Sequence, residues 1–93
     1  LGRHEDSINC YDYALKVAPN FYGAWYNRGN ALDALGRYDE AVESYQAALA
    51  IKPNLREAWY NWGSTLHKAG RYEEAIASYD QAIQLDPKFA KAW

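Results

Sequence analysis

The chain repeats itself every 34 residues. Three prolines and three tryptophans mark this period, at Pro19, Pro53 and Pro87 and at Trp25, Trp59 and Trp93. When residues 20–53 are laid over residues 54–87, 16 of the 34 positions are identical. A fixed period of this length is typical of architectures in which similar units stack on one another. Function is therefore expected on a surface built by repetition and not in a catalytic pocket.

Each period contains two helical patterns. Between residues 56 and 87, apolar and small residues recur at spacings of three and four, first at Ala58, Trp59, Trp62, Gly63, Leu66 and Ala69, then at Tyr72, Ala75, Ile76, Tyr79, Ala82 and Ile83. This rhythm predicts two helices of about 13–15 residues. Gly70 stands between them, where a left-handed cap residue is expected, and Gly36 stands at the same place in the preceding period. Because the connection is so short, the two helices are predicted to be antiparallel.

Two glycines lie in the middle of predicted helices. Gly29 and Gly63 occupy the same position of the period, and a mid-helix glycine costs about 1 kcal/mol relative to alanine. A cost repeated at one position implies a compensating contact. We expect a close approach of the partner helix there, with the rings of Tyr45 and Tyr79 filling the space beside the glycines.

Composition and charge narrow the function classes. The chain has 93 residues, which fits one domain. Its net charge of −2 has interspersed signs, so no clustered basic face for nucleic acid is expected. No apolar run approaches the roughly 20 residues of a membrane span. The only cysteine is Cys10, which excludes an intrachain disulfide and fits a reducing compartment, and we expect a cytoplasmic location. Because the chain starts without Met and in mid-period, we expect it to be a segment of a longer protein.

Residues able to perform chemistry are isolated from one another. His4 and His67 have no second ligand at metal-binding spacing. The acidic pairs recur with the period at the starts of helices, where carboxylates favour the helix dipole, at Glu5-Asp6, Asp39-Glu40 and Glu73-Glu74. We therefore expect no enzymatic activity, no cofactor and no metal.

The marker residues resemble the signature of the tetratricopeptide repeat, W-x2-L-G-x2-Y…A-x3-F…P. The two full units carry it at Trp25, Gly29, Leu32, Ala41, Tyr45, Ala48 and Pro53, and at Trp59, Gly63, Leu66, Ala75, Tyr79, Ala82 and Pro87. Arg28 and Trp62 depart from the signature, which has leucine before the glycine. Leucine also replaces its central tyrosine, and tyrosine replaces its phenylalanine.

The resemblance implies an all-α fold: a right-handed superhelical solenoid of antiparallel helix hairpins with about 2.7 repeats. We interpret residues 1–93 as a single domain. Residues 1–19 would be the second helix of a truncated repeat, 22–53 and 56–87 two whole repeats, and 88–93 the start of another.

The resemblance also implies a protein–protein interaction scaffold whose first helices line a concave groove that binds an extended peptide. By register, the groove positions are Gly23, Tyr26, Asn27, Asn30, Asp33 and Ala34 in one repeat, and Glu57, Tyr60, Asn61, Ser64, His67 and Lys68 in the next. The predicted peptide-binding residues among them are Tyr26, Asn27, Asn30, Tyr60, Asn61 and Ser64.

The repeated Tyr-Asn pair suggests how a peptide would be held. An amide side chain both donates and accepts, so Asn27 and Asn61 could pair with a peptide main chain. This is similar to the asparagine ladder of O-linked N-acetylglucosamine transferases. A full carboxylate clamp is not expected, because Tyr26 stands where such clamps have lysine. Whether these asparagines contact a ligand or are only typical of the repeat stays open.

Two other functions stay open. Stacked repeats bury a continuous core, so uncapped ends invite self-association. We expect an exposed apolar surface at these ends, and the candidate end-stacking residues are Ile8, Tyr11, Leu15, Phe89 and Trp93. The chain could also be the substrate-recognition region of a larger enzyme such as a glycosyltransferase.

Overall fold

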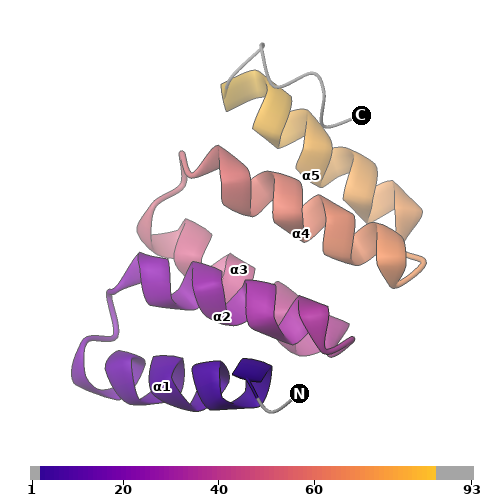
Figure 1. Ribbon diagram of the computed structural model, residues 1–93. Coiled ribbons are helices and arrows are strands. Elements are labelled where there is room, and N and C mark those ends of the chain that lie inside the picture. The colour runs from indigo at the N-terminus through magenta and orange to yellow at the C-terminus, as the bar shows by residue number, and fades with distance from the viewer. Residues whose placement is uncertain (1–2, 86–93) are drawn as a thin grey trace.

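The computed structural model describes residues 3–85, which form five α-helices (Figure 1). The helices are α1 (Arg3–Val17), α2 (Tyr22–Ala34), α3 (Tyr38–Ile51), α4 (Arg56–Lys68) and α5 (Tyr72–Leu85). No strand occurs within residues 3–85. The predicted all-α repeat fold is confirmed, and the two complete hairpins are α2–α3 and α4–α5.

A glycine in the left-handed region ends the first helix of each hairpin. Gly36 has a φ of 77° and Gly70 a φ of 82°. The backbone N–H of Arg37 donates to the carbonyl of Leu32 at 2.9 Å, and that of Gly36 donates to Asp33 at 3.0 Å. This pair of bonds is the Schellman motif, which satisfies the last carbonyls of a helix. The prediction that these glycines cap the first helices is confirmed.

Successive helices pack against each other along the whole described chain. Helix α2 contacts both α1 and α3, and α4 contacts both α3 and α5. In Figure 1, α2 and α4 lie side by side in front, with α3 behind them. Each first helix is therefore held between two second helices, and α2 and α4 together form one face of the stack.

The mid-helix glycines make room for tyrosine rings. A Cβ atom placed on Gly29 would lie 2.7 Å from Cε1 of Tyr45, and one on Gly63 would lie 2.8 Å from Cδ1 of Tyr79. Both distances are too short for a real contact. Tyr45 is 1% exposed, so its ring fills the space that the missing side chain leaves. The expected compensating contact is confirmed at both glycines.

The second helices bury one of their sides against the next repeat. Ile8 of α1 packs with Ala31 and Leu32 of α2, and Val42 of α3 packs with Leu66 of α4.

The prediction that Ile8 and Leu15 form an exposed apolar surface is wrong, because Ile8 is 5% and Leu15 is 8% exposed. Both occupy period positions that face the following first helix, which for α1 is α2. Tyr11 is half-buried. Phe89 and Trp93 lie outside the described residues.

Candidate functional site

A row of polar side chains joins α2 to α4. Tyr26, Asn30 and Asp33 on α2 face residues of α4 at the same spacing, namely Asn61, Thr65 and Lys68. Steps of four and then three residues keep side chains on one side of a helix. We call these six residues the seam network.

The centre of the seam network is the amide of Asn61. Its Nδ2 donates to Oη of Tyr26 at 2.8 Å and to Oδ1 of Asn30 at 3.0 Å. Oδ1 of Asn30 also accepts from Oη of Tyr45 at 2.6 Å. The two hydrogens of the Asn61 amide are thus used within the protein. Among residues 3–85, no hydrogen bond is formed by Oδ1 of Asn61 or by Nδ2 of Asn30, so one acceptor and one donor are left on adjacent helices.

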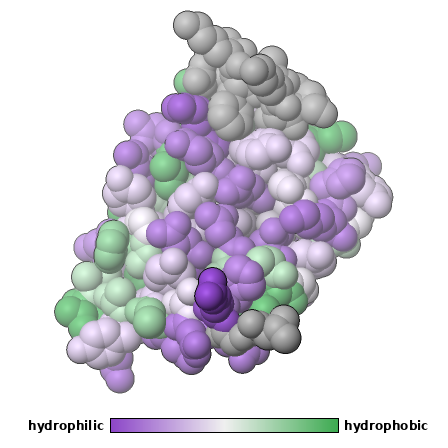
Figure 2. Space-filling model, viewed as in Figure 1, coloured by the Kyte–Doolittle hydropathy of each residue, from purple (hydrophilic) through white to green (hydrophobic). Residues whose placement is uncertain are grey.

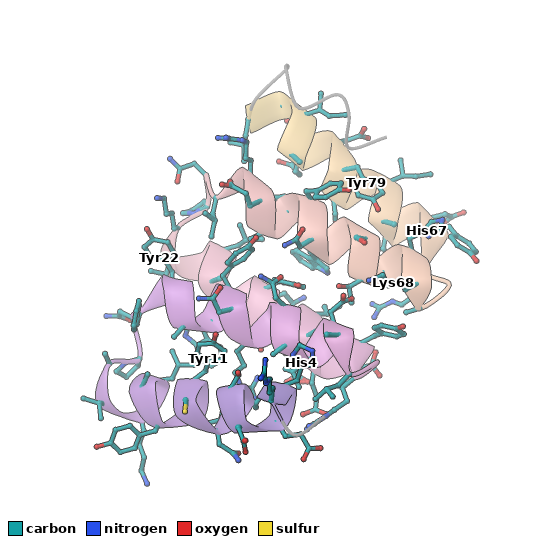
Figure 3. All side chains as sticks on the ribbon, in the orientation of Figure 1. His4, Tyr11, Tyr22, His67, Lys68 and Tyr79 are labelled. Atoms are coloured by element: carbon teal, nitrogen blue, oxygen red, sulfur yellow. The ribbon has the colours of Figure 1, made fainter. Side chains whose placement is uncertain are left out.

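The end of the seam network is an ion pair backed by a hydroxyl. Asp33 accepts from Oγ1 of Thr65 at 2.7 Å and from Nζ of Lys68 at 2.8 Å. The side chain of Asp33 is 18% exposed and that of Lys68 is 48% exposed. The hydrogen bond to Asp33 raises the pKa of Lys68 above its usual value. Figure 3 shows Lys68 at the end of α4 that lies beside α2. The lysine charge is therefore already offset by a carboxylate of the protein.

A small polar cavity opens on the seam network. Its volume is about 190 Å³, and its lining residues are Asn30, Asp33, Tyr45, Asn61, Ser64 and Lys68. Burial raises the pKa of Tyr45, and the nearby Asp33 carboxylate raises it further. The tyrosine therefore stays a neutral donor to Asn30 at physiological pH. The cavity offers hydrogen-bond donors and acceptors with little net charge.

The predicted peptide-binding residues divide into two groups. Asn30, Asn61 and Ser64 line the cavity, and Tyr26 holds Asn61. Asn27, the period equivalent of Asn61, is instead exposed. Within residues 3–85 its amide has no hydrogen-bond partner.

Tyr60, the remaining member of the predicted set, lies away from the cavity. Its ring contacts that of Tyr79, with centroids 5.7 Å apart. It is not among the residues that line the cavity.

Two residues of this region were not predicted as part of it. Tyr45 was expected only to pack, yet its hydroxyl holds Asn30. Thr65 is fully buried and bonded to Asp33. A signal for Thr65 exists in the sequence, because its equivalent in the preceding repeat is Ala31, and a hydroxyl at a buried position requires a partner.

Over residues 3–85, no three His, Cys, Asp or Glu side chains are grouped so that they could hold a metal ion. Of the helices in that range, none combines the length and the apolar character needed to cross a bilayer.

Comparisons with known proteins agree with this geometry. A family model described as Tetratricopeptide repeat matches residues 1–56, and a second one with the same description matches residues 57–89. The chain belongs to the tetratricopeptide repeat family. No curated protein matches the chain significantly.

Solved structures similar to this tetratricopeptide repeat chain include several of MamA. The structure titled "MamA MSR-1 C2" has a TM-score of 0.88 and 27% identity over 92% of this chain and 49% of that one. "Crystal structure of MamA" has a TM-score of 0.88 and 26% identity, over 96% and 52%. A structure of a MamA mutant has a TM-score of 0.79 and 32% identity, over 82% and 56%. The chain therefore spans about half the length of these MamA chains.

The family and the fold together support a coarse functional statement. Paired repeat helices and the likeness to other repeat proteins support a protein-interaction scaffold.

Proposed function

We propose that the face formed by α2 and α4 binds the main chain of an extended peptide, with the seam cavity as its central contact. The observation that carries the proposal is the unused pair on the seam network, Nδ2 of Asn30 and Oδ1 of Asn61. A peptide unit presents a C=O acceptor and an N–H donor, which match this donor and this acceptor.

The electrostatics favour a main chain over a free carboxylate. Lys68 is the cation that lines the cavity, and Asp33 already pairs with it at 2.8 Å. An incoming carboxylate would have to compete with a carboxylate that also has a hydrogen bond from Thr65. Neutral amide groups meet no such competition. Hydrophilic residues cover much of this face, and hydrophobic residues lie in small separate patches (Figure 2), which fits a polar ligand.

The remaining predicted groove residues extend this contact. Asn27 is exposed one helical turn from Asn30 on α2, and Tyr60 precedes Asn61 on α4. A peptide held at the cavity would run past them. Specificity for the side chains of the peptide would then come mainly from residues that flank the seam network.

Peptides selected from a displayed random library on the 93-residue chain provide the test. We expect Asn30→Ala and Asn61→Ala each to weaken such a peptide about tenfold, because each removes a bonding group and leaves a main-chain group unpaired. Tyr26→Phe is the matched control, since it breaks a seam bond but keeps the donor of Asn30 and the acceptor of Asn61. Circular dichroism monitors helicity. Unchanged affinity of both alanine variants would refute the proposal.

Self-association is a second candidate, favoured by an exposed apolar position on α5. Ile76 is 49% exposed, although its period equivalents Ile8 and Val42 are 5% and 7% exposed beneath a following first helix. A second copy could cover this side of α5 with the side of its α1 that carries the half-buried Tyr11. Sedimentation over a range of concentrations tests this, and Ile76→Asp should abolish any concentration dependence. A monomer at every concentration would exclude it.

The third reading, the substrate-recognition region of a larger enzyme, would use the same face of α2 and α4. A main-chain contact at Asn30 and Asn61 is compatible with it. It stays a prediction.

A further inference from the structure

The opposite side of α4 carries a second cavity. Its volume is about 360 Å³, and its lining residues are Trp59, Trp62, Leu66, Glu74, Ala77, Ser78 and Gln81. With about 3.6 residues per helical turn, positions 59, 62 and 66 share one side of α4, and positions 61, 65 and 68 share the other. The cavity is therefore separate from the seam network. Its size lies within the range of about 300–1,000 Å³ that is usual for ligand-binding pockets.

Two stacked tryptophans form one wall of this cavity. The rings of Trp59 and Trp62 have centroids 5.3 Å apart and an interplanar angle of 16°. Nε1 of Trp59 donates to the carbonyl of Pro53 at 2.9 Å, which fixes that ring. Nε1 of Trp62 is buried without an acceptor in the part of the chain described. The Trp62 ring is therefore held by its packing alone.

In the preceding repeat, the positions of Trp59 and Trp62 are occupied by a tryptophan and a cation, Trp25 and Arg28. Its tryptophan, Trp25, is fixed in the same way, by a hydrogen bond to the carbonyl of Pro19 at 3.0 Å. At the position of Trp62 this repeat has Arg28, whose Cζ lies 5.9 Å from the centroid of the Trp25 ring. The Arg28 guanidinium also contacts Asp12 and Ser44, each at 2.6 Å. In this repeat the protein itself supplies the cation that lies over the tryptophan.

The second repeat keeps one of these two acceptors and lacks the cation. Ser78 aligns with Ser44, but Gln46 stands at the position of Asp12. Glu74 brings a carboxylate to its cavity, and Ser78 and Gln81 bring neutral polar groups. Among the described residues, no lysine or arginine lines the cavity. Glu74 does pair with Arg71 at 2.5 Å, but their side chains are 56% and 43% exposed. A pair so exposed contributes little, so a partner's cation can compete with Arg71 for the carboxylate.

We propose that this cavity binds an arginine or lysine side chain of a protein partner, with its cationic head against the Trp59–Trp62 wall and beside Glu74. Tryptophan is the aromatic residue that attracts cations most strongly, and Arg28 over Trp25 is the internal precedent. The proposal concerns the face away from the seam network and does not depend on the peptide-binding proposal. It identifies the chemistry of the partner as basic.

The first test uses a blocked Gly-Gly-Arg-Gly-Gly peptide and its citrulline counterpart, which has nearly the same shape without the charge. Binding to the 93-residue chain is followed by the indole Nε1–H signals in NMR. We expect the arginine peptide to shift the signals of Trp59 and Trp62 while Trp25, already covered by Arg28, stays unchanged. The citrulline peptide should bind about tenfold more weakly. Equal binding of the two peptides, or no shift at Trp59 and Trp62, would overturn the proposal.

The second test uses a variant that the chain itself suggests. Trp62→Arg copies the first repeat, so it should fold and place its own guanidinium over Trp59. We expect it to abolish the response of Trp59 to the arginine peptide, and Glu74→Gln to weaken binding about threefold. Asn61→Ala, on the other side of α4, should leave the response intact, which separates this site from the peptide groove. An unchanged response in Trp62→Arg would contradict the assignment.

Discussion

The hairpins α2–α3 and α4–α5 share 16 of 34 positions, yet several aligned positions have different surroundings, and two of them concern the polar face and the tryptophan pair. Asn27 is exposed, while the identical Asn61 binds Tyr26 and Asn30. Arg28 reaches Asp12 and Ser44, while Trp62 stacks on Trp59.

The two differences have different origins. In the first, the residue is the same and the neighbour differs. Asn61 on α4 faces the preceding first helix, α2, whereas the described residues include no first helix before α2 for Asn27 to face. In the second, the neighbouring helices are equivalent and the residue differs. A repeat sequence thus determines packing within a unit, whereas the neighbouring unit determines what a groove residue does.

The largest expected contrast lies in the aromatic core. Tyr45 is 1% exposed and Tyr79 is half-buried, although both rings fill the space beside a glycine. Tyr45→Ala should lower the free energy of unfolding by about 3–5 kcal/mol and Tyr79→Ala by about 1–2 kcal/mol, because the cavity left at Tyr45 is fully enclosed. Urea titrations measure both. Equal losses would show that the repeats are energetically equivalent.

A smaller contrast is expected between the two asparagines. Asn61→Ala should lower the free energy of unfolding by about 1–3 kcal/mol, because Tyr26 and Asn30 lose their partner. Asn27→Ala should change it by less than about 0.5 kcal/mol, as is usual for an exposed position. The same titrations measure this pair. If Asn27→Ala lowered the free energy of unfolding as much as Asn61→Ala, the contrast between an exposed and a hydrogen-bonded asparagine would be contradicted.

Gly29 and Gly63 are a pair of aligned positions at which we expect the two repeats to respond in the same way to mutation. Ala at Gly29 or Gly63 would gain about 1 kcal/mol of helix propensity. Its Cβ would overlap a tyrosine ring, an overpacking that costs about 1–3 kcal/mol. We expect a net loss of about 1 kcal/mol at both positions, measured as a shift of the thermal midpoint. A gain in stability at either one would show that the ring moves aside freely.

The smallest effect at neutral pH concerns tyrosine ionisation. Burial raises the pKa of Tyr45 and, less strongly, that of Tyr79. Above the ordinary value of 10.0, the unfolded tyrosines ionise while the folded ones keep their protons. Stability should therefore be unaffected near neutrality and fall as the pH rises beyond about 10. Tyr45→Phe should flatten this fall more than Tyr79→Phe in alkaline urea titrations, and an identical fall in both variants would contradict the burial difference.

The helices and their turns could be predicted because they depend on residues within one period. Gly36 and Gly70 end helices through their own backbone conformation, and Gly29 is paired with Tyr45 at a fixed distance along the chain. The seam network could be predicted only in part. The period places Asn61 on the groove side of α4. It does not predict that the Asn61 amide donates to Oη of Tyr26 at 2.8 Å, because this contact depends on how α4 packs beside α2.

The burial of Ile8 and Leu15 could have been predicted from an alignment of the periods. Ile8 and Leu15 share their positions with Val42 and Leu49, which are apolar as well and buried beneath the next repeat. In α1 and α3 the apolar residue at the first of these positions packs against the following first helix, whereas Ile76, at the same position of α5, is 49% exposed. The burial of such a residue therefore depends on the neighbouring repeat and not only on the repeat that contains it.

The central claim is that the seam network of α2 and α4 presents a donor on Asn30 and an acceptor on Asn61 to a peptide main chain. The most direct measurement is an NMR titration of the 93-residue chain with a library-selected peptide, following the side-chain amide signals of Asn27, Asn30 and Asn61. We predict that the signals of Asn30 and Asn61 shift together with one saturation curve, and that the exposed Asn27 shifts less. Saturable binding with unmoved signals of Asn30 and Asn61 would contradict the account.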